Sequence, residues 1–342
     1  MAFKDAYIPY GGYWSTPFCR WQGSFQNLHA IEFAAETGRR FLGERKISPK
    51  EFDEIMLGIT VPQKHMFYGG PWLAGMMGAE HVTGPMISQA CATGAKSLAL
   101  AAQGVETGMQ SCILVVYADR CSNGPLLVYP DPNAPGGTMS KESWVWDNFG
   151  HAPYAKNAMV ETGENVAKEA GITREDQDSL TYLRYTQYQE ALKDDKAFQR
   201  KYMTVPVEIK DQRGRKVLMT VEGDEGVFPT TLEGLRELKP VLPGGTVTYG
   251  SQTHPADGNC GIVVTTREKA RRLRRAENVE VRVATYGESR TKKGYMAMAV
   301  VPAARMALER AGLSIADTVA IKTHNPFAVN DIYFCHEMDL VW

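Results

Sequence analysis

The chain has 342 residues, with 38 basic against 39 acidic side chains, so its formal net charge is -1. This balance argues against a nucleic-acid partner or an anionic membrane surface, because both favour a basic excess. No apolar run approaches the roughly 20 residues that a membrane-spanning helix needs, so we expect no membrane partner. The length allows one large domain or two ordinary ones. Hydrophobic residues make up 44% of the chain, which is enough for a sizeable core.

Six cysteines are scattered along the chain, and none forms a C-x-x-C pair: Cys19, Cys91, Cys112, Cys121, Cys260 and Cys335. This spacing predicts neither a zinc site nor a disulfide-redox motif. We therefore expect no metal and no permanently bound cofactor. No signal peptide is recognisable, which predicts a reducing, cytoplasmic compartment.

The first 120 residues alternate between predicted helices and strands. Helices are predicted over 29–41, 67–79 and 93–108, and strands over 54–60, 82–88 and 112–118. The last of these strands is a continuous apolar run, which is typical of a strand covered on both faces. The alternation predicts a layered α/β domain.

Cys91 lies between the predicted strand over 82–88 and the predicted helix over 93–108. A thiol at a helix N-terminus faces unpaired backbone N–H groups and the positive end of the helix dipole. Both favour the thiolate, which is the nucleophilic form of cysteine. The small neighbours Ala90, Ala92 and Gly94 leave room for a substrate. The alternative is that Cys91 is a buried small hydrophobic residue, as many free cysteines are.

Residues 121–245 have a different composition, rich in proline, glycine and charge. Two helices are predicted here, over 157–170 and 174–201. Thr173 and Asp176 have the spacing of a capping box at the start of the second helix. The stretch resembles an insertion or lid, a place where binding residues are often found.

The alternation resumes after residue 246, with predicted strands over 260–266, 279–286 and 318–323 and helices over 300–311 and 327–338. Gly312 is the expected stop signal of the first of these helices. The short basic stretch 267–275 is predicted to be a solvated helix face. This last part resembles a shorter copy of the first.

Several separate segments resemble signatures of the thiolase superfamily, and they occur in the family's order. Segment 90–95 (ACATGA) resembles the nucleophilic cysteine motif. Segments 162–167 and 171–178 resemble the loop-domain signature T/A-E-N-V-A…G-I-S-R-E-E-Q-D. Segments 246–258 and 301–313 resemble the family's next strand and helix regions. Segment 324–328 (HNPFA) falls where thiolases carry N-E-A-F-A, or H-D-C-F in sterol-carrier-type thiolases.

The resemblance implies a fold and a division into domains. The implied fold is α/β, with α-β-α-β-α layers formed by two related βαβαβαββ halves and an inserted loop domain. The implied parts are an N-terminal half over 1–120, a loop domain with acyl-CoA contacts over 121–245, and an incomplete C-terminal half over 246–342.

The resemblance also implies an acyl-CoA acyltransferase. Cys91 would carry the acyl group, in thiolysis of a 3-oxoacyl-CoA by coenzyme A or in the reverse condensation. His324 would donate to a thioester oxygen, directly or through water. Thr253, Met159, Met296 and Phe327 match residues that line the pantetheine channel. Core packing is the alternative for the two methionines and for Phe327, and a structural role is the alternative for His324.

One departure from the family lies near the end of the sequence. The family's G-H-P-x-G histidine and C-x-G cysteine would follow segment 324–328, and neither motif occurs here. Three explanations are open: a truncated or frameshifted reading of a longer thiolase, a chain completed by another subunit, or a non-catalytic relative. We favour the first, because the upstream motifs are intact, and we expect little thiolysis by this chain alone.

Two functions are therefore weighed, a thiolase-type acyltransferase and a non-catalytic subunit that binds acyl-CoA or serves as a scaffold. A homodimer or tetramer is expected, and a small zinc-ribbon/OB-fold protein is a possible partner. Fatty-acid or aromatic-acid degradation and lipid metabolism are the implied settings. The acyl group is not readable from the sequence: the aromatic residues of segment 7–25 and Trp144 and Trp146 favour core or dimer contacts over an aromatic acyl pocket.

Overall fold

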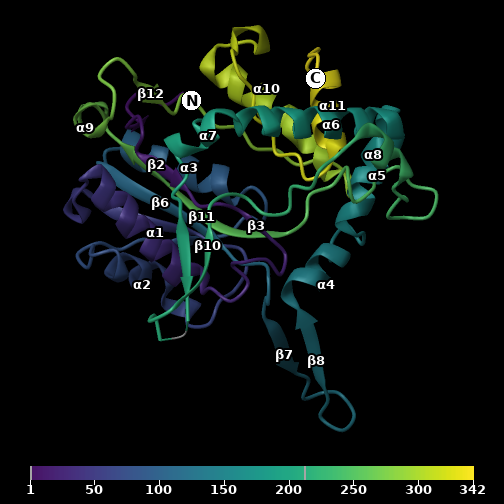
Figure 1. Ribbon diagram of the computed structural model, residues 1–342, viewed down its shortest axis with the longest axis horizontal. Coiled ribbons are helices and arrows are strands. Elements are labelled where there is room, and N and C mark those ends of the chain that lie inside the picture. Colours follow the sequence, from purple (N-terminus) through teal and green to yellow (C-terminus); the bar gives the residue numbers. More distant parts are fainter. Residues whose placement is uncertain (1, 212) are drawn as a thin grey trace.

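The computed structural model describes residues 2–211 and 213–342. Its centre is a mixed sheet with the strand order β12-β1-β11-β6-β4-β5, and β2 and β3 also pair with β11 (Figure 1). The strands are β1 (Tyr7–Ile8), β2 (Tyr13–Ser15), β3 (Cys19–Arg20), β4 (Glu54–Gly58), β5 (Met86–Ile87), β6 (Cys112–Asp119), β11 (Ala256–Thr265) and β12 (Val281–Arg282).

The sheet joins segments from both ends of the chain. β4 runs parallel to β5 and β6, whereas β11 runs antiparallel to β6 from the pair Thr265–Cys112 to the pair Gly258–Asp119. The division at residues 120 and 245 stays a prediction, although β11, which follows the second boundary, belongs to the same sheet as β6.

Helices cover both faces of this sheet, as the apolar run in β6 predicts. Leu57, Leu114 and Val116 point to one face and pack with residues of α1 (Ala30–Arg45) and α2 (Gly69–Met76). Alternate strand residues point to the other face, where Met56, Ile113 and Val115 pack with α3 (Thr93–Glu106). The period of two along each strand thus builds two cores from one sheet.

Leu114 tests the contribution of this core, because its side chain is fully buried. Leu114→Ala should lower the free energy of unfolding by about 2–5 kcal/mol, as truncation of a buried leucine removes apolar contacts and leaves a cavity. Denaturant unfolding followed by circular dichroism measures the loss. Met109→Ala is the control, since Met109 is 79% exposed. Equal losses in the two variants would contradict the assignment of the core.

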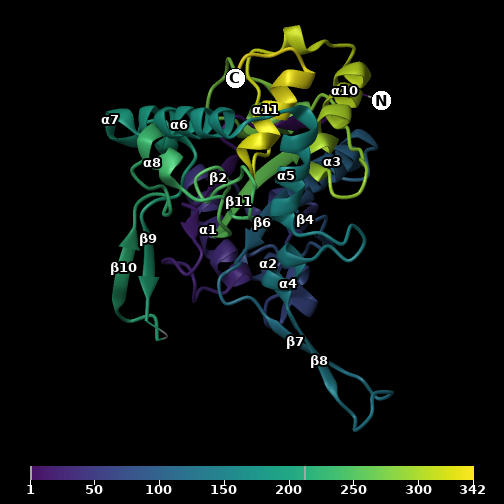
Figure 2. The same ribbon diagram turned by 90° about the vertical axis from the view of Figure 1, so that its right-hand side faces the viewer.

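Residues 121–245 form helices and two hairpins. The helices are α4 (Trp144–Gly150), α5 (Met159–Ala170), α6 (Arg174–Ala191), α7 (Lys193–Lys196) and α8 (Leu232–Glu237). The hairpins, β7 (Leu126–Pro130) with β8 (Met139–Ser143) and β9 (Val207–Lys210) with β10 (Val217–Val221), were not predicted. Figure 2 shows both projecting away from the sheet.

The helix predicted over 174–201 ends earlier than expected, at Ala191. Asp194 and Asp195 have φ angles of 52° and 54°, in the left-handed region that a continuing helix does not enter. The capping box at its start is confirmed, because the Thr173 hydroxyl accepts from the N–H of Asp176 and the Asp176 carboxylate accepts from the N–H of Thr173.

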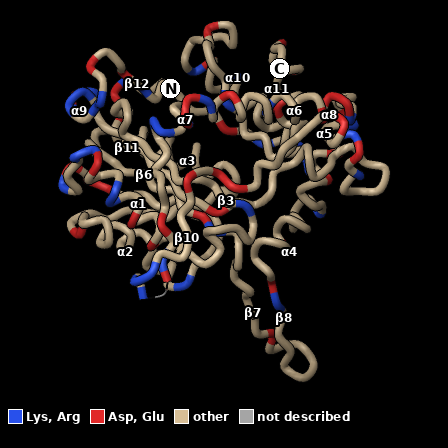
Figure 3. The backbone as a smooth tube through the Cα atoms, in the orientation of Figure 1, with Lys and Arg blue, Asp and Glu red and all other residues tan. Residues whose placement is uncertain are grey.

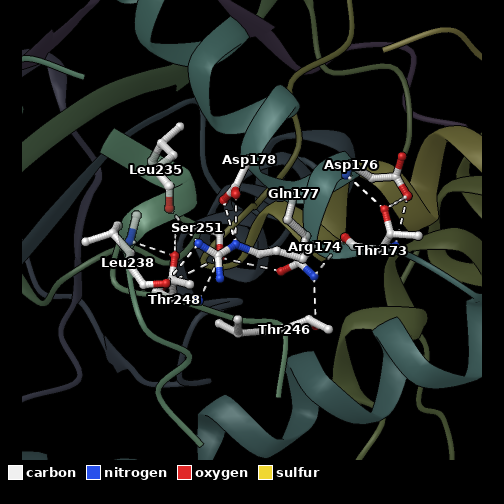
Figure 4. A network of polar contacts seen from close by, with 12 residues as sticks. Thr173, Arg174, Asp176, Gln177, Asp178, Leu235, Leu238, Thr246, Thr248 and Ser251 are labelled. Atoms are coloured by element: carbon white, nitrogen blue, oxygen red, sulfur yellow. Dashed lines mark hydrogen bonds and ion pairs between the residues drawn. The ribbon is translucent and has the colours of Figure 1, made fainter. Parts of the chain in front are cut away.

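The loop-domain signature joins α6 to its neighbours (Figure 4). The Arg174 side chain binds Asp178 with nitrogen–oxygen distances of 2.8 and 2.9 Å, and it also donates to the carbonyls of Leu235 and Leu238. Gln177 donates to the Thr246 hydroxyl at 2.9 Å. These residues therefore fix α8 and segment 246–251 against α6, which is a structural role.

The last part of the chain packs mainly as helices, namely α9 (Arg267–Leu273), α10 (Val300–Ala311) and α11 (Ala328–Glu337). α10 matches the predicted bounds and ends at Gly312, whose φ is 68°. The strand predicted over 318–323 is wrong: this segment is irregular, and Val319 is fully exposed. Among the described residues no neighbouring strand pairs with it, and a β sequence needs a partner to become a strand.

Candidate active site

Cys91 lies in a sharp turn between β5 and α3, as predicted. Ala90, just before it, has a φ of 45°, an unusual value for a residue with a Cβ atom. The Thr93 side chain closes the turn: its hydroxyl donates to the Ala90 carbonyl at 2.7 Å and accepts from the Gln89 N–H at 2.8 Å. The strained conformation therefore depends on a residue of the first turn of α3.

Gly58 at the end of β4 is needed for this close packing. A Cβ atom there would lie 2.7 Å from the Tyr117 ring and 3.1 Å from the Thr93 methyl group. The absence of a side chain lets β4 approach the turn that carries Cys91.

The turn opens on a cavity of about 800 Å³ at the ends of β4, β6 and β11. Its lining is mostly apolar and includes several aromatic rings: Tyr13, Trp14, Phe18, Tyr117, Trp144 and Phe149. Trp144 is tied to the cavity wall because its indole N–H donates to the Thr60 carbonyl at 3.0 Å. Tyr13, Phe18 and Trp144, which the sequence favoured as core or dimer contacts, thus line this space.

Cys91 is exposed as a residue, yet the direction of its pKa runs against the expected preference for the thiolate. Burial raises the pKa of the Cys91 thiol, and a hydrogen bond from its own backbone opposes this only in part. Asp119 and Cys121 also line this cavity. Burial raises the pKa of Asp119, and burial together with Asp119 and Asp257 raises the pKa of Cys121 to about 12.

Alkylation by iodoacetamide distinguishes the two expectations for Cys91. Because its pKa is raised, the thiolate fraction should still be growing between about pH 6 and 9, and the alkylation rate should rise about tenfold per pH unit. Peptide mass spectrometry after timed exposure gives the rate at Cys91 and, as an internal comparison, at Cys121. A rate at Cys91 that levels off below about pH 8 would instead indicate a thiolate stabilised by the helix N-terminus.

The other predicted residues gather beside α5 and α11, and they are not among the residues that line the cavity. Phe327 is buried in the apolar cluster that also includes Val166, Val247 and Ile332, and Met159 packs against that cluster. Met296 is 48% exposed at the start of a short 3-10 helix, Met296–Ala299. Core packing therefore accounts for Phe327 and Met159 but not for Met296.

Thr253 and the His324 loop are held together by backbone contacts. The Thr253 N–H donates to the Pro326 carbonyl at 2.8 Å, and the Ala328 N–H donates to the Ser251 carbonyl at 2.8 Å. His324 is exposed as a residue, yet desolvation lowers the pKa of its imidazole. A neutral imidazole carries one N–H donor and one acceptor nitrogen, so at neutral pH His324 can donate to a thioester oxygen.

A contact that the sequence did not predict ties the Cys91 turn to the last part of the chain. Glu288 accepts from Lys96 at 2.9 Å, from the Tyr286 hydroxyl at 2.9 Å and from the Gln89 side chain at 3.3 Å. These three donors lower the pKa of Glu288 to about 2. Gln89 lies two residues before Cys91, but nothing in the sequence pairs it with a carboxylate 199 positions away.

Comparison with known proteins assigns this chain to a family. Residues 13–268 match the profile described as "Thiolase, N-terminal domain". The chain belongs to the thiolase family. Acetyl-CoA acetyltransferase of Paracoccus denitrificans is 29% identical over 340 residues, covering 94% of this chain and 81% of that protein. A 3-oxoadipyl-CoA/3-oxo-5,6-dehydrosuberyl-CoA thiolase of Escherichia coli is 26% identical, with 95% and 82% covered.

Solved thiolase structures share the fold. Human mitochondrial 3-ketoacyl-CoA thiolase in complex with CoA has a TM-score of 0.87 at 23% identity, covering 100% of this chain and 84% of that chain. Acetyl-CoA acetyltransferase of Bacillus anthracis has a TM-score of 0.86 at 24% identity, with 99% and 84% covered. The predicted thiolase-like α/β fold is confirmed.

The family membership also confirms the predicted enzyme class. This member of the thiolase family is an acyltransferase acting on acyl-CoA, and the non-catalytic scaffold is not favoured. The roles of Cys91, His324 and the four channel residues, the sterol-carrier subtype and the truncation stay predictions.

Proposed function

We propose that Cys91 is the acyl-carrying nucleophile of a thiolase reaction. The observation that carries this proposal is the position of Cys91, on a strained turn at the wall of an 800 Å³, mostly apolar cavity. A nucleophile on a tight strand-to-helix turn is exposed to a substrate without obstruction from its own neighbours. The cavity leaves space beside it for an acyl chain.

The first step transfers an acyl group from coenzyme A to Cys91. The Cys91 thiol loses its proton to water, and the sulfur then attacks the thioester carbonyl and forms a carbon–sulfur bond. The tetrahedral intermediate collapses, the bond from carbon to the coenzyme A sulfur breaks, and the released CoA thiolate takes up a proton. Negative charge builds on the carbonyl oxygen, which makes a fixed donor such as the neutral His324 imidazole the main catalytic need. In the second step either coenzyme A or a carbanion from a second acyl-CoA accepts the acyl group, so degradation and condensation share this intermediate.

Coenzyme A would reach Cys91 as a substrate along Thr253, Met159, Met296 and Phe327. Thr253 is exposed and its backbone N–H supports the His324 loop, while the exposed Met296 offers an apolar contact to the pantetheine arm. Phe327 and Met159 would shape the channel from the core side, since both belong to the packing around α5 and α11.

Mass spectrometry of the intact chain after mixing with acetyl-CoA tests the proposal. The expected product is a single acetyl adduct on Cys91. Binding of coenzyme A without an adduct would instead support an acyl-CoA-binding scaffold. Cys121→Ser is the matched control, because Cys121 lines the same cavity and should not carry the acyl group.

We propose that the chain forms a homodimer or tetramer in the cytoplasm. β5 lies at the edge of the main sheet with its outer side free within the described chain. The β7–β8 hairpin projects with few charges (Figure 3) and with Leu126, Val128 and Met139 exposed, which suits contact with a second copy. Light scattering after gel filtration gives the oligomeric state, and a pull-down tests the zinc-ribbon/OB-fold partner.

All six cysteines are free in the described structure, as a reducing compartment requires.

No helix among the described residues is long and apolar enough to cross a bilayer. The setting in fatty-acid or aromatic-acid degradation rests on the names of relatives such as the 3-oxoadipyl-CoA thiolase.

A further inference from the structure

The two residues on either side of His324 bind the same carboxylate. The Thr323 hydroxyl donates to one oxygen of Asp331, and the Asn325 amide donates to the other at 3.0 Å. Asp331 lies in the first turn of α11, and it is 2% exposed. The buried Asp331 carboxylate therefore holds the backbone on both sides of His324 through Thr323 and Asn325.

Arg184 of α6 binds the same carboxylate. Its Nε and one terminal nitrogen lie 3.0 and 2.9 Å from Asp331 Oδ2. Hydrogen bonds between two charged groups are about twice as strong as neutral ones. Each oxygen of the buried carboxylate thus has a partner, and Asp331 connects α6, α11 and the His324 loop.

The loop depends on this contact because its upstream side is otherwise unsupported. Downstream of His324, backbone bonds from segment 251–253 hold Pro326 and Ala328. Upstream, the backbone of residues 319–323 makes no hydrogen bond within the described chain, and Val319 is fully exposed. The His324 imidazole has no hydrogen-bond partner among the described residues, so its position depends on the backbone that carries it.

We propose that Asp331, backed by Arg184, is a positioning residue that aims the His324 imidazole at the thioester oxygen. This inference rests on the proposed role of His324. A competing interpretation is that the Arg184–Asp331 pair only joins two helices. The two differ in whether the effect of Asp331 requires His324.

Asp331→Asn is the first test, because it keeps the shape and removes the charge. The rate of Cys91 acetylation should fall roughly 10- to 100-fold, the order of effect expected when a catalytic group is displaced by about 1 Å. In the double variant with His324→Ala, the rate should equal that of His324→Ala alone, because Asp331 acts only through the imidazole and has nothing left to position. Asp178→Asn is the matched control: Asp178 is 3% exposed in its side chain and paired with Arg174, and it makes no hydrogen bond to residues 319–328 among the described residues. It should lower the melting temperature without changing the acetylation rate. If Asp331→Asn fails to fold, Thr323→Val removes one contact of the loop, keeps the Arg184 pair, and should still slow acetylation.

Two results would overturn the proposal. The first is a double variant in which the losses from Asp331→Asn and His324→Ala multiply. The second comes from the NMR signals of the histidine ring C–H groups, assigned by the loss of one signal in His324→Ala. Asp331→Asn should shift and broaden the His324 signal, and Asp178→Asn should not; a His324 signal unchanged in Asp331→Asn means that the loop needs no such support. This second measurement needs no activity, so it decides the proposal even if the wild-type chain forms no adduct and the proposed function is wrong.

Discussion

Cys91→Ser is expected to abolish the acyl adduct formed with acetyl-CoA, with a loss of at least about a thousandfold in rate. A serine hydroxyl has nearly the size of the thiol but is far less acidic. The thiolate is the reactive form of cysteine, so the substitution removes the nucleophile and keeps the turn. The measurement is the fraction of acetylated chain against time, with the site mapped by peptide fragmentation.

Three neighbouring variants make this result specific. Cys121→Ser and Cys260→Ser change the other two thiols that line the cavity and should keep the adduct. Ala90→Gly removes the Cβ atom that makes the φ of 45° strained, and this variant should also keep the adduct. An adduct that persists in Cys91→Ser would place the acyl group on another residue and contradict the proposed nucleophile.

Local sequence patterns predicted the elements that carry Cys91 because those patterns are short in range. Helix α3 follows from one apolar face, α10 ends where Gly312 permits a left-handed residue, and Thr173 caps α6. Each signal lies within a few residues of the feature that it predicts. The motif around Cys91 is equally short, so the sequence alone predicted the turn between β5 and α3.

The sequence failed where structure depends on distant partners. Segment 318–323 has the composition of a strand, but the pairing that would make it one is absent from the described chain. The β7–β8 and β9–β10 hairpins lie in the stretch whose proline, glycine and charge predicted an insertion or lid. Glu288 and Asp331 bind side chains of other elements, Lys96 and Arg184. A single sequence does not show which distant residues form such pairs.

The electrostatic prediction for Cys91 failed for a related reason. The helix N-terminus is visible in the sequence, whereas the protein wall around the thiol is not. Desolvation of the thiol outweighs the favourable backbone contact and raises the pKa of Cys91. In a thiolase this means that the proton of Cys91 has to be removed during the reaction, a task that the resemblance assigns to a G-H-P-x-G histidine that this sequence does not contain.

His324→Ala is expected to slow acetylation of Cys91 by about 10²–10³-fold, the usual effect of removing one donor from a developing oxyanion. Desolvation lowers the pKa of His324, so the imidazole is neutral at neutral pH and gains a proton only in more acid solution. The ratio of the wild-type rate to the variant rate should therefore be constant from about pH 7 upward. Single-turnover acetylation followed by quenched mass spectrometry gives the rates.

The choice of replacement separates donation from packing. His324→Asn restores an N–H donor in a shorter side chain and should recover part of the rate, whereas His324→Phe fills the space without a donor and should not. His336→Ala is the control, since His336 is exposed on α11 and lies outside the segment that resembles the family motif. Equal rates in the wild type and His324→Ala would remove His324 from the chemistry and leave the backbone N–H of Cys91 as the donor to consider at the thioester oxygen. That outcome would also separate His324 from the histidine of the sterol-carrier-type motif, so the experiment decides whether the resemblance at 324–328 extends from sequence to mechanism.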